Sequence, residues 1–115
     1  QRRYAECCEP LHQGMTVAAT AEALMRSRYS AYVLGQLPYL LQTWHVATRP
    51  PTLELDPATR WLGLKIIEQQ TQDDHATVRF VARWAQAGGS AQRFQECSRF
   101  VREDGRWFYV DGDLS

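Results

Sequence analysis

The chain has 115 residues and is 44% hydrophobic, which suits one compact domain and excludes a second full domain. Thirteen basic residues balance thirteen acidic ones, so no uniform electrostatic field attracts nucleic acid or an anionic membrane. No apolar run reaches the roughly 18–20 residues that a membrane-spanning helix needs, and three cysteines are too few for a disulfide framework. The composition therefore predicts a soluble, cytoplasmic protein that binds neither a membrane nor nucleic acid.

The N-terminal segment differs in character from the rest of the chain. Residues 1–16 are polar and contain proline and glycine, which indicates a short arm rich in turns. Residues 17–115 carry the regular hydrophobic patterns of a folded domain. The adjacent thiols of Cys7 and Cys8 do not easily join each other in a disulfide, but both can contribute to a tetrahedral zinc site. The alternative is a pair of ordinary free thiols.

Two helices are predicted in the first half of the chain. Thr20 stands at an N-cap position, apolar residues then recur at helical spacing, and Gly35 provides a C-terminal stop. Pro38 suits the first turn of a second, shorter helix that includes Trp44 and His45 and ends before a Pro-Pro pair. His45 would then lie at a helix C-terminus, where the helix dipole favours its charged form.

The remainder of the chain has the pattern of a sheet. After Arg60 the hydrophobic period changes from about 3.6 to 2, which predicts consecutive antiparallel strands joined by short turns. The pair Asp104-Gly105 is a strong signal for a two-residue hairpin turn. Helices followed by antiparallel strands indicate the α+β fold class. The expected strands cover residues 61–71, 76–86, 91–102 and 106–111.

The last hairpin predicts which side chains share a face. With the Asp-Gly pair at the centre of the turn, Phe100 lies opposite Tyr109, and Ser98 lies opposite Asp111. Glu96 is then expected to point toward the helices, with Asp111 diagonally across from it. The face that we expect to point inward collects Phe94, Glu96, Ser98, Phe100, Trp107, Tyr109 and Asp111.

The same face has to continue onto the preceding strand, where Val78 and Phe80 alternate with polar residues. This requires a connection of odd length at Gly88-Gly89, such as a three-residue loop with a bulge. The outer face of the sheet would then carry four arginines whose charges are expected to be solvated. They are Arg79, Arg83, Arg93 and Arg99.

Two residues of the helical segment are candidates for chemistry. Arg28 falls on the apolar stripe of the first helix, where an unpaired charge would cost on the order of several kcal/mol. We therefore expect a carboxylate partner, Glu96 or Asp111, in a structural ion pair or in a group that anchors a ligand. His45 beside Glu96 would form an acid–base pair, because burial and neighbours tune both side chains toward neutral pH. The alternative for His45 is a cap or a residue at the edge of the core.

The arm and the domain together resemble a known family. The string YAECC, followed by EPLHQG, resembles the second half of the SEC-C motif, and the strings RSRYSAYV and SRFVREDGRWFYVDGD are similar to the bacterial YchJ family. The resemblance implies a nuclear-transport-factor-2-like domain at 17–115, in which helices pack into a curved, mostly antiparallel sheet and leave a cone-shaped pocket. It implies that Cys7 and Cys8 are zinc ligands, with the other half of the motif just before Gln1. It implies zinc in the full-length protein, an incomplete site in this chain, and no particular reaction.

Three functions of different classes are considered. The leading one is a noncatalytic module that binds a small ligand or a protein partner and carries the SEC-C zinc motif. The second is an enzyme in which Glu96, with His45 or Asp111, transfers protons in the cone pocket. The third is a homodimer formed through the outer face of the sheet. The residues expected to line the pocket are Arg28, Tyr32, Trp44, Ser98, Trp107 and Tyr109.

Overall fold

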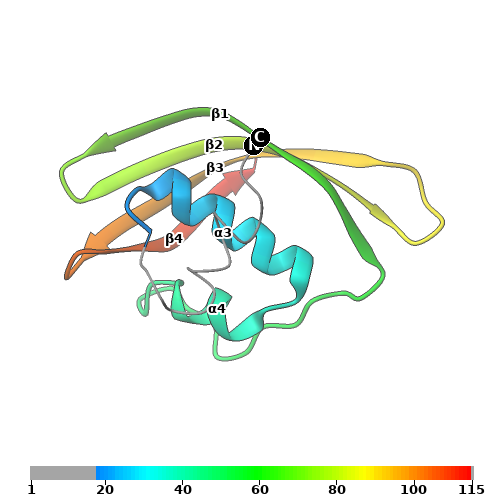
Figure 1. Ribbon diagram of the computed structural model, residues 1–115, viewed down its shortest axis with the longest axis horizontal. Coiled ribbons are helices and arrows are strands. Elements are labelled where there is room, and N and C mark those ends of the chain that lie inside the picture. The colour runs from blue at the N-terminus through cyan, green and yellow to red at the C-terminus, as the bar shows by residue number, and fades with distance from the viewer. Residues whose placement is uncertain (1–17, 115) are drawn as a thin grey trace.

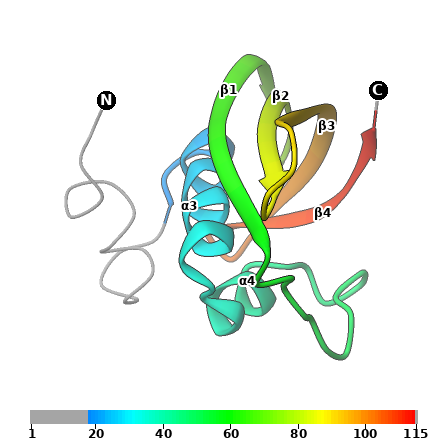
Figure 2. The ribbon, with the colours of Figure 1, turned by 90° about the vertical axis from the view of Figure 1, so that its right-hand side faces the viewer.

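The computed structural model describes residues 18–114 and has the predicted order of two helices followed by a sheet (Figure 1). The four strands are antiparallel and lie in the order β1-β2-β3-β4. The sheet curves around the helices, so that its concave face covers α3 (Figures 1 and 2). The prediction of an α+β fold is confirmed. The elements are α3 (Ala21–Leu34), α4 (Leu37–Gln42), β1 (Thr59–Gln72), β2 (His75–Gln86), β3 (Gln92–Glu103) and β4 (Arg106–Leu114).

Helix α3 begins and ends where its capping residues predict. The Thr20 hydroxyl accepts a hydrogen bond from the backbone N–H of Ala23 at 3.0 Å, which satisfies a donor in the first helical turn. Gly35 has a φ of 72°, the left-handed conformation that ends many helices. One side of α3 is buried against the sheet, and Arg28 lies on that side together with Leu24 and other small or apolar residues. The helix therefore carries a charged residue into the interior.

Helix α4 is shorter than predicted and ends at Gln42. The chain then runs beside β4 in an extended conformation and forms a parallel bridge between Trp44 and Tyr109. The N–H of His45 donates to the carbonyl of Tyr109 at 2.7 Å, and the N–H of Tyr109 donates to the carbonyl of Thr43 at 2.8 Å. The expectation that His45 lies at a helix C-terminus is therefore wrong. Thr43 and His45 form backbone hydrogen bonds with β4, and these bonds would be lost if the helix continued for another turn.

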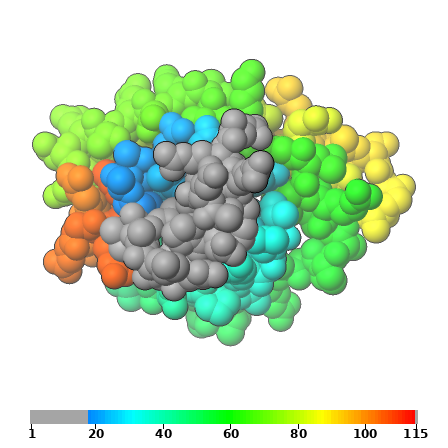
Figure 3. All heavy atoms as spheres, in the orientation of Figure 1, coloured from blue at the N-terminus to red at the C-terminus, as the bar shows by residue number. Residues whose placement is uncertain are grey.

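The turn between β2 and β3 has the odd length that the inward face requires. Phe80 lies opposite Glu96, and Ala82 lies opposite Phe94, so Glu96 shares the concave face with buried residues of β2. Gly88 at the turn has a φ of 77°, which glycine adopts readily. The turn forms the yellow projection at the right of the space-filling view (Figure 3). The prediction that Glu96 points toward the helical layer is confirmed.

The hairpin of β3 and β4 follows the predicted register for its first part and then departs from it. Phe100 lies opposite Tyr109 as expected, but Arg99 lies opposite Asp111, so Val110 is an extra residue in a β-bulge. Beyond the bulge, Ser98 lies opposite Gly112. The prediction that Asp111 faces inward is wrong, because one extra residue moves every later side chain to the other face.

The core lies between α3 and the concave face of the sheet. Phe100, Leu24, Leu40 and Val78 are almost completely inaccessible to solvent, and aromatic residues of β1, β3 and β4 pack against them. In the part of the chain that the structure describes, no helix is long and apolar enough to cross a membrane.

Candidate functional site on the concave face

Arg28 is the most deeply buried charged residue of the described chain, with a relative exposure of 3%. Its Nη1 atom donates to the carbonyl of Leu40 at 2.8 Å and to the hydroxyl of Thr43 at 2.7 Å. The guanidinium carbon lies 5.3 Å from the ring centre of Trp44 and 4.6 Å from that of Tyr109, within the range of cation–π interactions. Arg28 thus joins α3 to the end of α4 and, through Tyr109, to β4.

The expectation that Arg28 pairs with Glu96 or Asp111 is wrong. Within residues 18–114, Arg28 forms no ion pair with a carboxylate. Burial lowers the pKa of Arg28, and the nearby oxygen atoms of Tyr32 and Tyr109 oppose that shift. Two uncharged acceptors and two aromatic faces therefore compensate in part for the loss of hydration. Arg28 is structural in this arrangement, because its hydrogen bonds hold α3 and α4 together.

Glu96 is half-buried on the concave face beside Ser98. The buried hydroxyl of Ser98 donates to Oε2 of Glu96 at 2.7 Å. Gly112 lies under the same carboxylate, and a Cβ at this position would collide with the Glu96 side chain. Gly112 could not be identified from the sequence, because its role depends on the bulge at Val110, which moves Gly112 opposite Ser98. One hydrogen bond from Ser98 therefore orients the Glu96 carboxylate, and the missing side chain of Gly112 leaves the space that it occupies.

Tyr109 links the buried guanidinium to the acidic group. Its ring makes edge contacts with Trp44 and Phe100, at centroid distances of 5.1 and 5.8 Å. Burial raises the pKa of Tyr109 to about 12, and the negative charge of Glu96 adds to this shift while Arg28 opposes it. Tyr109 therefore keeps its hydroxyl proton at any physiological pH and can act as a hydrogen-bond donor on the concave face.

The raised pKa of Tyr109 predicts a loss of stability at alkaline pH. An unfolded tyrosine titrates near pH 10, whereas Tyr109 titrates at about 12 in the fold. The stabilising contribution is complete below pH 10 and is lost as the pH rises toward 12. We expect chemical denaturation at stepped pH to show this decline. Absorbance titration should report a lower Tyr109 pKa in Glu96→Gln than in the control Glu103→Gln, and a Tyr109 pKa near 10 in the unmodified chain would contradict the assignment.

His45 and Asp111, the predicted partners of Glu96 in acid–base chemistry, both lie away from it. Because successive residues of an extended segment point to opposite sides, Trp44 faces inward and His45 faces outward. The Nε2 atom of His45 lies 2.9 Å from the Glu103 carboxylate. Asp111 accepts a hydrogen bond from Arg99 at 2.6 Å on the outer face. The catalytic constellation expected from the sequence is therefore not assembled.

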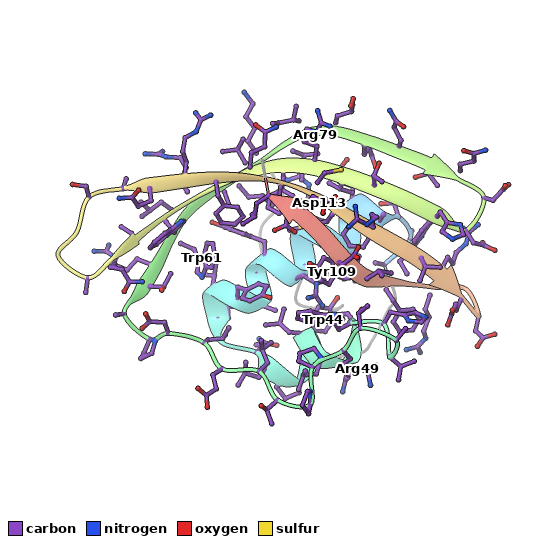
Figure 4. The ribbon with its side chains drawn as sticks, turned by 180° about the vertical axis from the view of Figure 1, so that it is seen from behind. Trp44, Arg49, Trp61, Arg79, Tyr109 and Asp113 are labelled. Atoms are coloured by element: carbon purple, nitrogen blue, oxygen red, sulfur yellow. The ribbon has the colours of Figure 1, made fainter. Side chains whose placement is uncertain are left out.

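Several aromatic residues cover the concave face around this acid and cation. Figure 4 shows Trp61, Tyr109 and Trp44 on the helical side of the sheet. Trp61 meets Tyr32 and Phe94 at centroid distances of 5.9 and 6.4 Å. Alternation in the sequence does not distinguish a core position from a site wall, so Trp61 could not be assigned to the site from the sequence.

Trp107, another predicted pocket residue, lies on the same hairpin as Tyr109. It is buried, and the guanidinium of Arg102 lies 5.1 Å from its ring centre. The buried indole N–H groups of Trp107 and Trp44 make no hydrogen bond to any described residue. Such groups lose hydration without compensation, so both rings are held in place by packing.

The expected zinc ligands Cys7 and Cys8 lie outside the described residues. Between residues 18 and 114, no three His, Cys, Asp or Glu side chains gather closely enough to hold a metal ion. Cys97, the cysteine of this part, is a free thiol on β3. A zinc site in this protein would therefore have to draw on the N-terminal thiols.

Comparison with known proteins agrees with this architecture. Residues 20–112 match the family model described as YchJ, middle NTF2-like domain. A UPF0225 protein from Bordetella pertussis is 59% identical over 117 residues, covering 98% of this chain and 87% of that protein. A UPF0225 protein from Ralstonia nicotianae is 55% identical over 125 residues, covering 97% and 86%. The solution structure of a SEC-C motif containing protein from Rhodopseudomonas palustris is similar with a TM-score of 0.89 and 32% identity, covering 99% of this chain and 93% of that one.

Proposed function

The chain belongs to the YchJ family, and we propose that it is a noncatalytic ligand-binding or protein-interaction module that works together with a SEC-C zinc motif. The NTF2-like fold supplies a concave sheet face that can receive a ligand, and the SEC-C arm supplies the zinc-dependent element. The solved relative with this fold is itself described as containing a SEC-C motif, which supports the combination of the two parts.

The observation that carries the noncatalytic form of the proposal is the separation of Glu96 from His45 and Asp111, the partners expected in acid–base chemistry. Acid–base catalysis by the expected pair would need both groups within hydrogen-bond reach of the same reacting atoms. Glu96 instead accepts a hydrogen bond from Ser98, while His45 is bound to Glu103. A carboxylate oriented by Ser98 beside the protonated Tyr109 hydroxyl offers an acceptor and a donor to a polar ligand.

The ligand-binding form of the proposal places a small polar molecule against Glu96 and Tyr109. Tyr109 offers a donor and Glu96 an acceptor, and the aromatic rings of Trp61 and Tyr32 supply apolar surface nearby. The hydrogen bond from Nη1 to the carbonyl of Leu40 holds the Arg28 guanidinium in place. The guanidinium packs on the ring of Tyr109 and so helps to fix the position of that ring. Arg28 is therefore a positioning residue in this form.

The zinc part of the proposal rests on Cys7 and Cys8. Adjacent thiolates supply two of the four ligands that a closed structural zinc site takes, and the other half of the SEC-C motif would supply the remainder. Bound zinc would order the arm through its ligands. Neither thiolate is assigned any role in a reaction.

The test uses the full-length protein with its complete motif. We expect metal analysis to find one zinc per chain, and the double variant Cys7→Ser/Cys8→Ser to lose it. The control Cys97→Ser keeps the zinc, because Cys97 lies on β3 and not on the arm. Full-length protein without bound zinc, or zinc retention by the double variant, would overturn the proposal.

A further inference from the structure

The outer face of the sheet, away from the helices, carries a groove of about 780 Å³. It runs across β1, β2 and β3, next to the end of the sheet where the β2–β3 turn projects. The groove is lined by basic, aliphatic and amide side chains. Among them are Lys65, Ile67, Val81, Arg83, Arg93 and Gln95.

The cations of this groove face one another without acidic partners. Arg83 and Arg93 are directly opposite on adjacent strands, where like charges repel. Lys65 lies on the next strand, opposite Val81. Among the residues that the structure describes, none of these three cations forms an ion pair. A group that neutralised all three would relieve this repulsion.

The rest of the same face carries carboxylates as well as arginines. Arg79 lies opposite Glu68 and points away from the helices (Figure 4). Arg99 donates to Asp111 at 2.6 Å and to Asp113 at 2.6 Å. Of the four arginines predicted on this face, Arg99 is neutralised by ion pairs and Arg79 lies opposite a glutamate on the next strand, whereas Arg83 and Arg93 have no carboxylate opposite them. The positive charge of the face is therefore concentrated at the groove.

We propose that this groove binds an acidic, extended segment of a protein partner, with carboxylates at Lys65, Arg83 and Arg93. This inference rests on the proposed role as an interaction module and names the surface and the chemistry of its partner. Ile67 is 47% exposed and Val81 forms part of the floor, so the groove also offers apolar surface to aliphatic side chains between the acids.

The composition of the face favours a peptide over nucleic acid. Proteins that bind single strands stack bases on aromatic side chains, and no aromatic side chain lines this groove. A phosphate backbone crossing the sheet would meet Asp111 and Asp113 beyond the cationic part. A short segment that alternates acidic and aliphatic residues satisfies both the cations and the floor without reaching these aspartates.

The test is a titration of the ¹⁵N-labelled chain with the acidic peptide EVDIEVD, followed by amide chemical shifts. We expect shifts at groove residues on β1, β2 and β3, and an affinity that falls about fivefold to tenfold in Arg83→Glu and in Arg93→Glu. The matched control Arg79→Glu changes the same charge on the same face outside the groove, and it should change affinity less than about twofold to threefold.

Folding of the variants is checked by their melting temperature. Arg93→Glu places opposite charges across the two strands, so we expect its Tm to rise by about 2–4 °C while its binding falls. Absence of groove shifts, an equal loss in Arg79→Glu, or tighter binding of oligo-dT than of the peptide would overturn the inference. None of these outcomes bears on zinc uptake by the full-length protein, so the proposed function and the groove fail separately.

Discussion

Replacement of Arg28 by alanine is expected to lower the free energy of unfolding by about 3–5 kcal/mol, as measured by chemical denaturation. The change removes the two donors to Leu40 and Thr43 and leaves a buried carbonyl with a weaker partner. It also leaves a cavity beside the rings of Trp44 and Tyr109. The loss of stability should be large because Arg28 connects its own helix α3 both to α4 and to β4.

Two variants separate the role of the Arg28 charge from that of its volume. Arg28→Met fills much of the same space and is expected to cost about 1–3 kcal/mol, because it removes the hydrogen bonds but not the packing. Arg26 lies on another face of the same helix and serves as the control. Arg26→Ala breaks its exposed ion pair with Glu22 and should change the free energy of unfolding by less than about 0.5 kcal/mol. A value for Arg28→Ala as small as that for Arg26→Ala would show that Arg28 does not join the layers.

The helices show which features can be predicted from local sequence. Thr20 and Gly35 act within a few residues, and the structure places both caps as expected. The partner of Arg28 could not be found in this way, because the carbonyl of Leu40 and the ring of Tyr109 are brought to it by tertiary packing. Desolvation can be compensated by a carbonyl and aromatic faces as well as by a carboxylate, so a buried charge in a sequence does not identify its partner.

The position of His45 shows a second reason why the structure differs from the sequence prediction. His45 has helical spacing with the preceding apolar residues, but hydrogen bonds to the backbone of β4 end the helix at Gln42, three residues before His45. Trp44 then remains on the concave side and His45 moves to the side of Glu103. A shift of this size changes the chemistry of the site from a proton-transfer pair to a single acid beside Tyr109. The proposed binding function depends on that change.

Deletion of Val110 is expected to lower the free energy of unfolding by no more than about 2 kcal/mol, because it removes the extra residue of the bulge and keeps the later pairs of β3 and β4 in register. After the deletion, regular pairing still places Asp111 opposite Arg99 and Gly112 opposite Ser98, so both aspartates stay on the outer face. The bulge is needed only while Val110 is present, since regular pairing of the intact chain would turn Asp111 toward the concave face, where a carboxylate loses hydration. The deletion therefore keeps both aspartates beside Arg99.

Two further variants test this register. Val110→Ala keeps the bulge and should cost no more than about 1.5 kcal/mol, since it removes two methyl groups from a partly buried side chain. Asp111→Asn with Asp113→Asn should lower stability in the deletion variant and in the intact chain alike, because it removes the partners of Arg99. If the deletion costs more than about 4 kcal/mol and the two asparagines recover that loss, the acids have turned inward and the later pairs do not keep their register.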